Sequence, residues 1–248
     1  MKVKKITKAD LDENNYYRHS ESLNVDGSIE IERNLGMVRF RGFLSAAGGI
    51  DAAYGSGINA GLWIEAGDGI KAGSGIEAGS GIEAGSWIKA GDGIEAGDGI
   101  KAGSGIEAGD GIKAGSWIKA GLWIEAGAGI ESGSWIKAGL WIEAGDGIKA
   151  GSWIEAGDGI KAGSGIEAGL WIEAGSGIEA GLQISAKKTI SAKLRISAGI
   201  CSWRNPLPEE MTITAQRVEG EVGCGIVKLL APEASVNSDS SPQTENKI

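Results

Sequence analysis

The sequence predicts an all-β protein whose centre is a three-sided parallel β-helix, a solenoid built from six-residue repeats. Isoleucine occurs at every sixth residue from Ile58 to Ile196, without a miss. Alanine follows two residues after each isoleucine, with Ser132 as the exception, and glycine occupies the next position from Gly61 to Gly181. Such strict periodicity is typical of a repeat architecture rather than of a flexible glycine-rich chain.

Each repeat reads as one short strand followed by a corner. Ile-(Glu/Lys)-Ala alternates apolar, charged and apolar residues, which is the pattern of a half-buried strand. A helix is excluded because frequent glycine would cost about 1 kcal/mol at each occurrence. The glycine that follows is expected to form the corner with a positive φ. One such strand cannot bury its isoleucine, but stacked copies place the isoleucines in columns.

The residue that precedes each isoleucine is expected to point outward, and it reveals an 18-residue period. Tryptophan takes this position on two of the three faces only, at Trp63, Trp87, Trp117, Trp123, Trp135, Trp141, Trp153 and Trp171. The remaining face carries glycine from Gly57 to Gly165 in every turn. Three repeats therefore make one turn, and the repeats from Ile58 onward predict about eight turns.

The flanking segments divide the chain into five parts. Residues 1–22 are expected to form a polar segment, and residues 23–57 irregular first turns, with Val25, Ile31, Met37 and Phe43 as their inward series. The regular β-helix covers 58–200. Alternation in 211–218 and 221–230 predicts a hairpin cap within 201–231, and the polar composition of 232–248 predicts a disordered tail.

Composition and charge restrict the classes of function. The formal net charge is −9, and 58–182 alone carries 18 acidic residues against 8 lysines, so that neither nucleic acid nor an anionic membrane is an expected partner. No apolar run has the length of a membrane span and the first ten residues lack a signal peptide's apolar region, so a cytoplasmic location is expected. Cys201 and Cys224 are expected to remain thiols rather than to form a disulfide.

The repeat resembles the hexapeptide-repeat family of β-helices, whose unit begins with an aliphatic residue and has a small residue four positions later. The resemblance covers 58–200 and implies a left-handed coil. Asp68 and Leu62 depart from the family's small residue, and the right-handed bactofilins have a similar shape, so both hands stay open. The motif Ile-(Lys/Glu)-Ala-Gly is also similar to repeat proteins of gut bacteria and their phages, a likeness that implies no residue roles.

The outward tryptophans are the best candidate binding residues. Four fall on one face in successive turns, and two are neighbours on the adjacent face; they are Trp117, Trp135, Trp153, Trp171, Trp123 and Trp141. The bare face offers a second surface that a flat partner can approach closely, at Gly75, Gly93, Gly111, Gly129 and Gly147. An exposed aromatic row typically marks an interaction site, although rings that only stack on each other explain it equally well.

These features favour a non-catalytic binding or assembly scaffold, acting as a homo-oligomer or with a protein partner and without a cofactor or metal. A phage-type inhibitor that uses the acidic surface is one alternative. An acyltransferase-like enzyme is another, implied by the family resemblance, in which His19 would be the base. His19 is the chain's single histidine and lies outside the repeats, and the many carboxylates form a repeating lattice rather than a catalytic pair.

Overall fold

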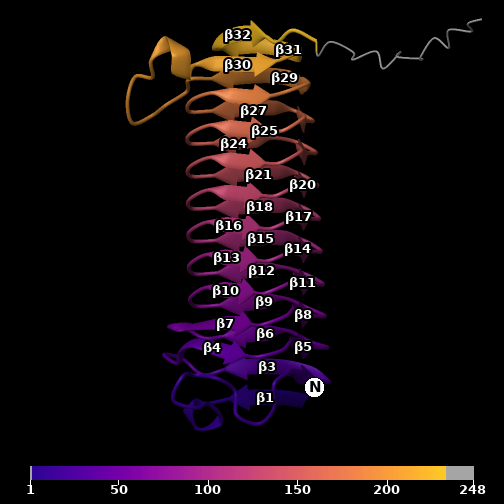
Figure 1. Cartoon of the computed structure of the whole chain (residues 1–248), viewed down its shortest axis with the longest axis vertical. Helices are drawn as coiled ribbons and strands as arrows, with labels where there is room; N and C mark the ends of the chain where they lie inside the picture. Colours follow the sequence, from indigo (N-terminus) through magenta and orange to yellow (C-terminus); the bar gives the residue numbers. More distant parts are fainter. Residues whose placement is uncertain (1, 233–248) are drawn as a thin grey trace, which may run out of the picture.

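The computed structural model describes residues 2–232 and forms a parallel β-solenoid whose turns stack in one column (Figure 1). The predicted fold class is confirmed. The stack has about twelve turns rather than eight, because irregular segments at both ends continue the same ladders. Parallel pairing joins each strand to the strand one turn later, and the strands lie on three faces.

We name the faces by the outward residues of their central turns. The glycine face contains β4 (Gly36–Phe40), β7 (Ser56–Ala60), β10 (Ile76–Ala78), β13 (Ile94–Ala96), β16 (Ile112–Ala114), β19 (Ile130–Ser132), β22 (Ile148–Ala150), β25 (Ile166–Ala168), β28 (Ile184–Ala186), β30 (Thr212–Ala215) and β32 (Ile226–Leu229). The strip face contains β2 (Leu23–Val25), β5 (Leu44–Ala46), β8 (Ile64–Ala66), β11 (Ile82–Ala84), β14 (Gly99–Ala102), β17 (Trp117–Ala120), β20 (Trp135–Ala138), β23 (Trp153–Ala156) and β26 (Trp171–Ala174).

The third face contains β1 (Lys2–Ile6), β3 (Gly27–Ile31), β6 (Ile50–Ala52), β9 (Ile70–Ala72), β12 (Ile88–Ala90), β15 (Gly105–Ala108), β18 (Trp123–Ala126), β21 (Trp141–Ala144), β24 (Ile160–Ala162) and β27 (Gly177–Ala180). Two long strands, β29 (Thr189–Ala198) and β31 (Arg217–Cys224), run from the strip face onto the third face. Two short 3-10 helices, η1 (Lys8–Asp10) and η2 (Pro208–Glu210), lie outside the ladders.

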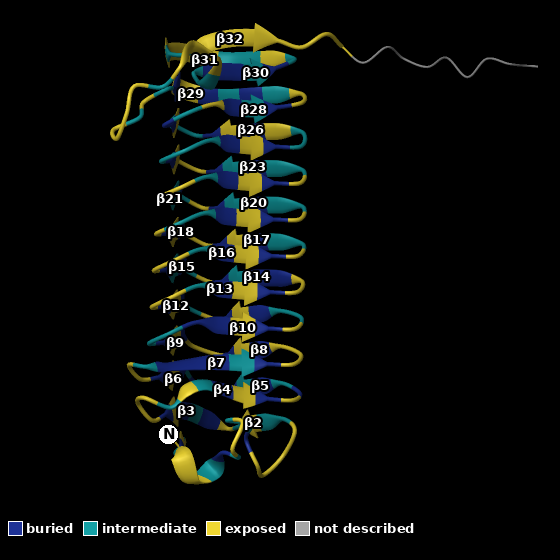
Figure 2. Ribbon diagram, turned by 60° about the vertical axis from the view of Figure 1, so that its left-hand side comes forward, coloured by how far each residue is buried: buried dark blue, intermediate teal, exposed yellow. Residues whose placement is uncertain are grey.

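The core is a set of isoleucine and alanine columns inside the three faces. Repeat isoleucines are at most 1% exposed and repeat alanines at most 7%, while the residue between them faces outward, so buried and exposed residues alternate along the short strands (Figure 2). Ser132 replaces one alanine, and its hydroxyl lies 2.8 Å from the carbonyl oxygen of Ser116 and 2.9 Å from that of Trp135. Burying an isoleucine contributes about 1.5–3 kcal/mol to stability, before the conformational entropy lost on folding is subtracted.

The corner glycines are required for a reason other than the expected positive φ. None of those from Gly61 to Gly181 adopts the left-handed conformation. Instead, a Cβ on Gly121 would lie 1.9 Å from the carbonyl oxygen of Gly103, one turn below, and the neighbouring corners repeat this close approach. With a carbon–carbon bond of about 1.5 Å, the glycine Cα lies within about 3.4 Å of that oxygen, the range of a weak Cα–H···O contact. From Gly61 to Gly181 the corners stack too closely for a side chain.

The chain changes its path at one of the two positions where lysine replaces this glycine. Lys193 stands where the repeat would place a corner glycine, and β29 continues through it as one ten-residue strand. Lys187 also replaces a corner glycine, but the chain still bends at 187–188. At Lys193, by contrast, the corner opens into a strand that spans two faces.

The N-terminal turns are longer and use a different inward series from the predicted one. In the regular part Ile58 pairs with Ile76, whereas Val38 pairs with Ile58 and Leu23 with Leu44, so each of these first turns contains more residues than a regular one. The longer corners shift the register. As a result, Ile31 is buried as expected, but Met37 and Phe43 point outward, and Val38, Phe40, Leu44 and Ile50 fill the core.

The segment 1–22 is more than a polar extension. Its strand β1 pairs in parallel with β3 and buries Ile6, and the chain then crosses the end of the stack, where Leu11 and Tyr17 are also buried. Tyr17 packs against Phe40, with ring centroids 5.5 Å apart. These apolar residues cover the end of the isoleucine columns, and three lysines lie on the outermost strand, Lys2, Lys4 and Lys5.

The predicted C-terminal hairpin is wrong. β30 lies between β28 and β32 in parallel, and β31 pairs in parallel with β29, so these segments extend the solenoid instead of folding back on each other. Alternating apolar residues indicate a strand but do not specify its partner. All four residues of β32 are exposed on the last turn. The predicted tail at 232–248 lies outside the described residues except for its first residue.

Candidate functional site

The four tryptophans of the strip face form a continuous stacked row, which we call the Trp strip (Trp117, Trp135, Trp153, Trp171). Parallel pairing places each directly above the previous one. Successive ring centroids are 5.4, 5.0 and 5.9 Å apart, with interplanar angles of 13°, 2° and 1°. Neighbouring rings are therefore stacked nearly parallel to each other. Each stacked pair contributes about 0.5–1.5 kcal/mol beyond the burial of its apolar surface.

The first ring of the row lies on a glycine. A Cβ on Gly99 would meet ring atoms of Trp117 at 2.3–2.7 Å, so this ring leans across the turn that precedes its own. Gly69 and Gly105 support Trp87 and Trp123 in the same way. A glycine one turn earlier in the same column is thus the sequence signal for where a tryptophan row begins.

Self-stacking leaves part of the Trp strip in contact with solvent. Trp171, the last ring, is 36% exposed, and the other three are half-buried. Because one tryptophan offers at most about 250 Å², the row presents no more than about 350 Å². Such an area is that of the largest apolar patch on a typical monomer, which is often functional, but it is less than half of one partner's share of a standard interface.

The third face carries the shorter row. Trp123 and Trp141 stack at 5.9 Å, and beyond Trp141 the outward positions are Gly159 and Gly177. These residues border a hollow of about 330 Å³, whose wall includes Lys161. The Lys161 ammonium donates a 2.6 Å hydrogen bond to Glu143, which raises the pKa of the lysine.

The glycine face is hollowed along its whole regular part. Six successive glycines line a groove of about 840 Å³, which we call the glycine groove (Gly75, Gly93, Gly111, Gly129, Gly147, Gly165). It extends over about 24 Å at the spacing of paired strands. Met37 lies at its N-terminal end and Gln183, at the next outward position of the column, at its other end.

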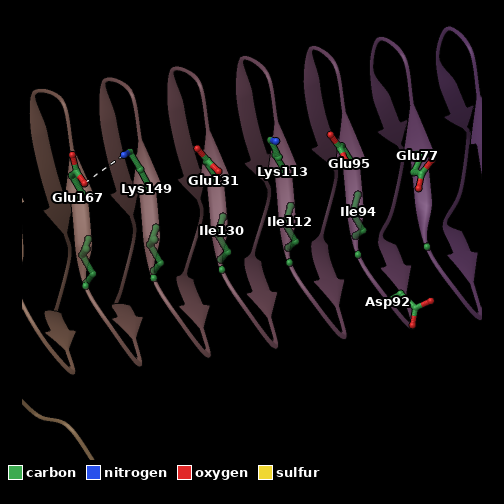
Figure 3. A pocket seen from close by; sticks show the side chains of 18 of the residues that line it. Glu77, Asp92, Ile94, Glu95, Ile112, Lys113, Ile130, Glu131, Lys149 and Glu167 are labelled. Carbon is green, nitrogen blue, oxygen red and sulfur yellow. Dashed lines mark ion pairs between the residues drawn. The ribbon is translucent and has the colours of Figure 1, made fainter.

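One wall of the glycine groove is a row of charged side chains, with one residue per turn (Figure 3). Its members alternate in sign over part of its length; they are Glu77, Glu95, Lys113, Glu131, Lys149 and Glu167. Lys149 and Glu167 form an ion pair at 3.7 Å. Asp92 lies on the other side of the isoleucines, at the corner that precedes Gly93 (Figure 3).

The charged rows of the other two faces are partly paired along the stack. Lys101 bonds Glu83 and Lys137 bonds Glu155 on the strip face, at 2.5 and 2.7 Å. The side chains of these pairs keep contact with solvent, so each pair contributes no more than about 1 kcal/mol. Each pair neutralises the two charges locally, while acidic side chains remain in excess over lysines along the repeats.

All the predicted site residues lie where the 18-residue period placed them, on two tryptophan-bearing faces and one glycine face. The sequence did not reveal a second large groove at the N-terminal end of the third face. It has a volume of about 850 Å³ and is bordered by Lys5, Glu30, Asp51, Asp68 and Trp87. This groove depends on the parallel pairing of β1 with β3, for which only the apolar Ile6 gave a signal.

Other chemical groups lie apart from these surfaces. His19 is exposed in the N-terminal cap, 3.1 Å from Asp10 and edge-on to Tyr17. Hydrogen bonds from the Thr7 backbone and side chain lower the pKa of Asp10. Cys201 and Cys224 are free and partly buried.

Within residues 2–232, no cluster of three or more histidine, cysteine, aspartate or glutamate side chains has the arrangement of a metal site. The same residues contain no helix long and apolar enough to cross a membrane. Comparisons with models of protein families, with curated proteins and with solved structures found no match for this chain.

Proposed function

We propose that this protein is a non-catalytic scaffold that associates with copies of itself, and through the same surfaces with protein partners. The observation that carries the proposal is the pairing of two regular surfaces on one rigid column, the Trp strip and the glycine groove. Both surfaces repeat at the strand spacing of about 4.8 Å. A fold whose side chains serve only to cover the backbone has no need to confine aromatic rings to two faces.

The physical argument rests on shape and desolvation. The Trp strip is a ridge with apolar ring edges, and the glycine groove lets another surface approach the backbone closely. Together with the flanking charged rows, either surface is long enough to reach the area of a specific interface. Aromatic residues are also the side chains most enriched at the centres of interfaces.

The test is the molar mass of the intact protein in solution, measured by light scattering across a range of concentrations. We expect a defined multiple of the 25.4 kDa chain mass, and a lower mass for the double variant Trp135→Ala/Trp153→Ala. Trp63→Ala/Trp87→Ala removes two rings outside the strip that are more exposed than Trp135 and Trp153, and it serves as the control. A monomer at high concentration that captures no protein partner through the strip contradicts the proposal.

The acidic-inhibitor alternative has less support. An effective mimic of nucleic acid needs one sign of charge along its surface, whereas lysines interrupt the acidic rows and pair with them. A partner recognised by net charge would dissociate steeply as salt is raised. A partner held by the Trp strip would be retained.

A further inference from the structure

The Trp strip and the glycine groove occupy the same height along the stack. One turn of chain contains Gly111 and then Trp117, and the next contains Gly129 and then Trp135. The two following turns repeat this order with Gly147 and Trp153 and with Gly165 and Trp171. Because both rows belong to one solenoid, their pitch is identical.

Equal height has a consequence for symmetry. When copies of a chain form a closed ring by rotation alone, the two contacting surfaces of each copy must lie at the same level along the rotation axis. A difference in level would add a translation at every contact and produce an open helical filament. The strip and groove satisfy the condition for a ring whose axis is parallel to the solenoid.

The lengths also match. The glycine groove extends over six turns between Met37 and Gln183. The four rings of the strip, the first of which leans back over Gly99, extend over five turns. A ridge of this length fits within the groove, and the side chains at its two ends limit sliding.

Charge supports the same contact. When two solenoids lie side by side with parallel axes, the strands of the two contacting faces run in opposite directions. The lysines that follow the strip tryptophans of one copy therefore lie opposite the corners that precede the groove glycines of the other copy. Lys101 and Lys119 are at the heights of Asp92 and Asp110, both of which are exposed. Glu155 is at the height of Asp146, and its ion-pair partner Lys137 lies one turn away.

The opposite wall of the contact is free of like charges at the turns of Trp117, Trp135 and Trp153, whereas at the lowest turn Glu95 is at the height of Asp98. The charged row beside the groove, from Lys113 to Lys149, faces the corners that precede the strip, which are Ser116, Ser134 and Ser152. These are short polar side chains, so the row keeps its solvent contact, or its lysines donate hydrogen bonds to the serine hydroxyls and Glu131 accepts one, without an opposing charge.

From these observations we infer that the Trp strip of one copy seats in the glycine groove of the next, in a closed ring with all solenoids parallel. The inference rests on the proposed self-association and specifies its contact. The contact is heterologous, because each copy uses a different surface on either side. The third face, with Trp123 and Trp141, takes no part in it.

Complementation between two variants tests the contact. Trp135→Glu/Trp153→Glu disables the strip, and Gly129→Glu/Gly147→Glu fills the groove. A Cβ on Gly129 or Gly147 meets only a carbonyl oxygen, at 3.3 and 3.2 Å, so both side chains extend into the groove. The matched controls are Trp141→Glu and Gly159→Glu, the same changes on the third face.

We expect each disabled variant to have the mass of the 25.4 kDa chain in light scattering, and the equimolar mixture to contain a one-to-one dimer. In the mixture, the intact groove of one variant binds the intact strip of the other. The remaining strip and groove are both disabled, so the assembly stops at two chains. Both controls keep the mass of the wild-type protein. Circular dichroism verifies that each variant is folded.

If the glutamate variant of the groove is unfolded, Gly129→Trp replaces it, because tryptophans on the other faces begin their rows above a glycine one turn earlier. A wild-type oligomer whose two disabled variants do not combine overturns the inference but leaves the scaffold proposal standing. The same holds if the filled groove leaves the mass unchanged, which would assign association to another surface, such as the exposed last turn. A monomeric wild-type protein overturns the inference, and it also contradicts the scaffold proposal if it captures no protein partner through the strip.

Discussion

Replacing the corner glycine Gly121 with alanine should destabilise the protein, although the residue is exposed and outside the core. The new Cβ would lie 1.9 Å from the Gly103 carbonyl oxygen, whereas an ordinary contact begins at 3.4 Å. The two corners must therefore move apart until the gap reaches that of an ordinary contact. The movement stretches the hydrogen bonds from the Gly121 and Leu122 amides to the turn below, which are 3.1 and 2.7 Å long.

The magnitude follows from these two effects. Two backbone hydrogen bonds are worth about 1 kcal/mol each, and overpacking adds about 1–3 kcal/mol. The reduced entropy of the unfolded chain returns about 0.4–1 kcal/mol. The net loss is about 3 kcal/mol, which lowers the melting temperature by about 6–12 °C for a chain of this size.

Thermal and guanidinium unfolding, followed by circular dichroism, measure the effect against Gly159→Ala. In that control the Cβ meets a carbonyl oxygen at an ordinary 3.7 Å, so its stability should stay level or rise by less than about 1 kcal/mol. Two glycines from one repeat unit thus have opposite predicted outcomes. Equal midpoints for the two variants would refute the steric explanation of the corners.

Two further predictions concern local structure. Gly99→Ala should displace the Trp117 ring, because the added Cβ would lie 2.3 Å from it. Near-ultraviolet circular dichroism and acrylamide quenching of tryptophan fluorescence should detect the displacement. The control Gly81→Ala, whose Cβ would have its nearest atom 3.3 Å away, should leave both signals unchanged. In the C-terminal loop, a bidentate ion pair with Arg204 and a backbone hydrogen bond lower the pKa of Glu210 to about 2. A depressed acid pKa contributes stability above the ordinary value of 4.5, and this contribution is lost as pH falls through about 2. An NMR titration of the Glu210 carboxyl carbon should have its midpoint near pH 2, and Arg204→Gln should move that midpoint toward 4.5. A midpoint near 4.5 in the unmodified protein would contradict the ion pair between Arg204 and Glu210.

The regular part of the fold could be predicted because one physical requirement repeats there. Ile58 and its successors are buried only if every sixth residue points inward, and the one-sided placement of tryptophan adds the 18-residue turn. The outward direction of Trp135 follows from the same period. Its stacking follows once strands are in register, since equivalent residues of successive turns then lie one above another.

Other features depend on distances between turns, which a one-dimensional pattern does not contain. The need for Gly121 arises from the carbonyl oxygen of Gly103 in the preceding turn, not from its own φ. At the N-terminus, longer corners shift the inward series to Val38 and Leu44. At the C-terminus, alternation in 211–218 indicated a strand but did not distinguish parallel stacking from a hairpin.

The most direct test of the central claim, that the Trp strip is the contact surface, is radical footprinting of tryptophan oxidation at low and high protein concentration. We expect Trp135 and Trp153 to become protected as concentration rises, because association covers them. Trp63 and Trp87 are about 40% exposed on turns outside the strip and should keep a constant rate. Uniform protection of all four, or protection of the latter pair alone, would contradict the claim.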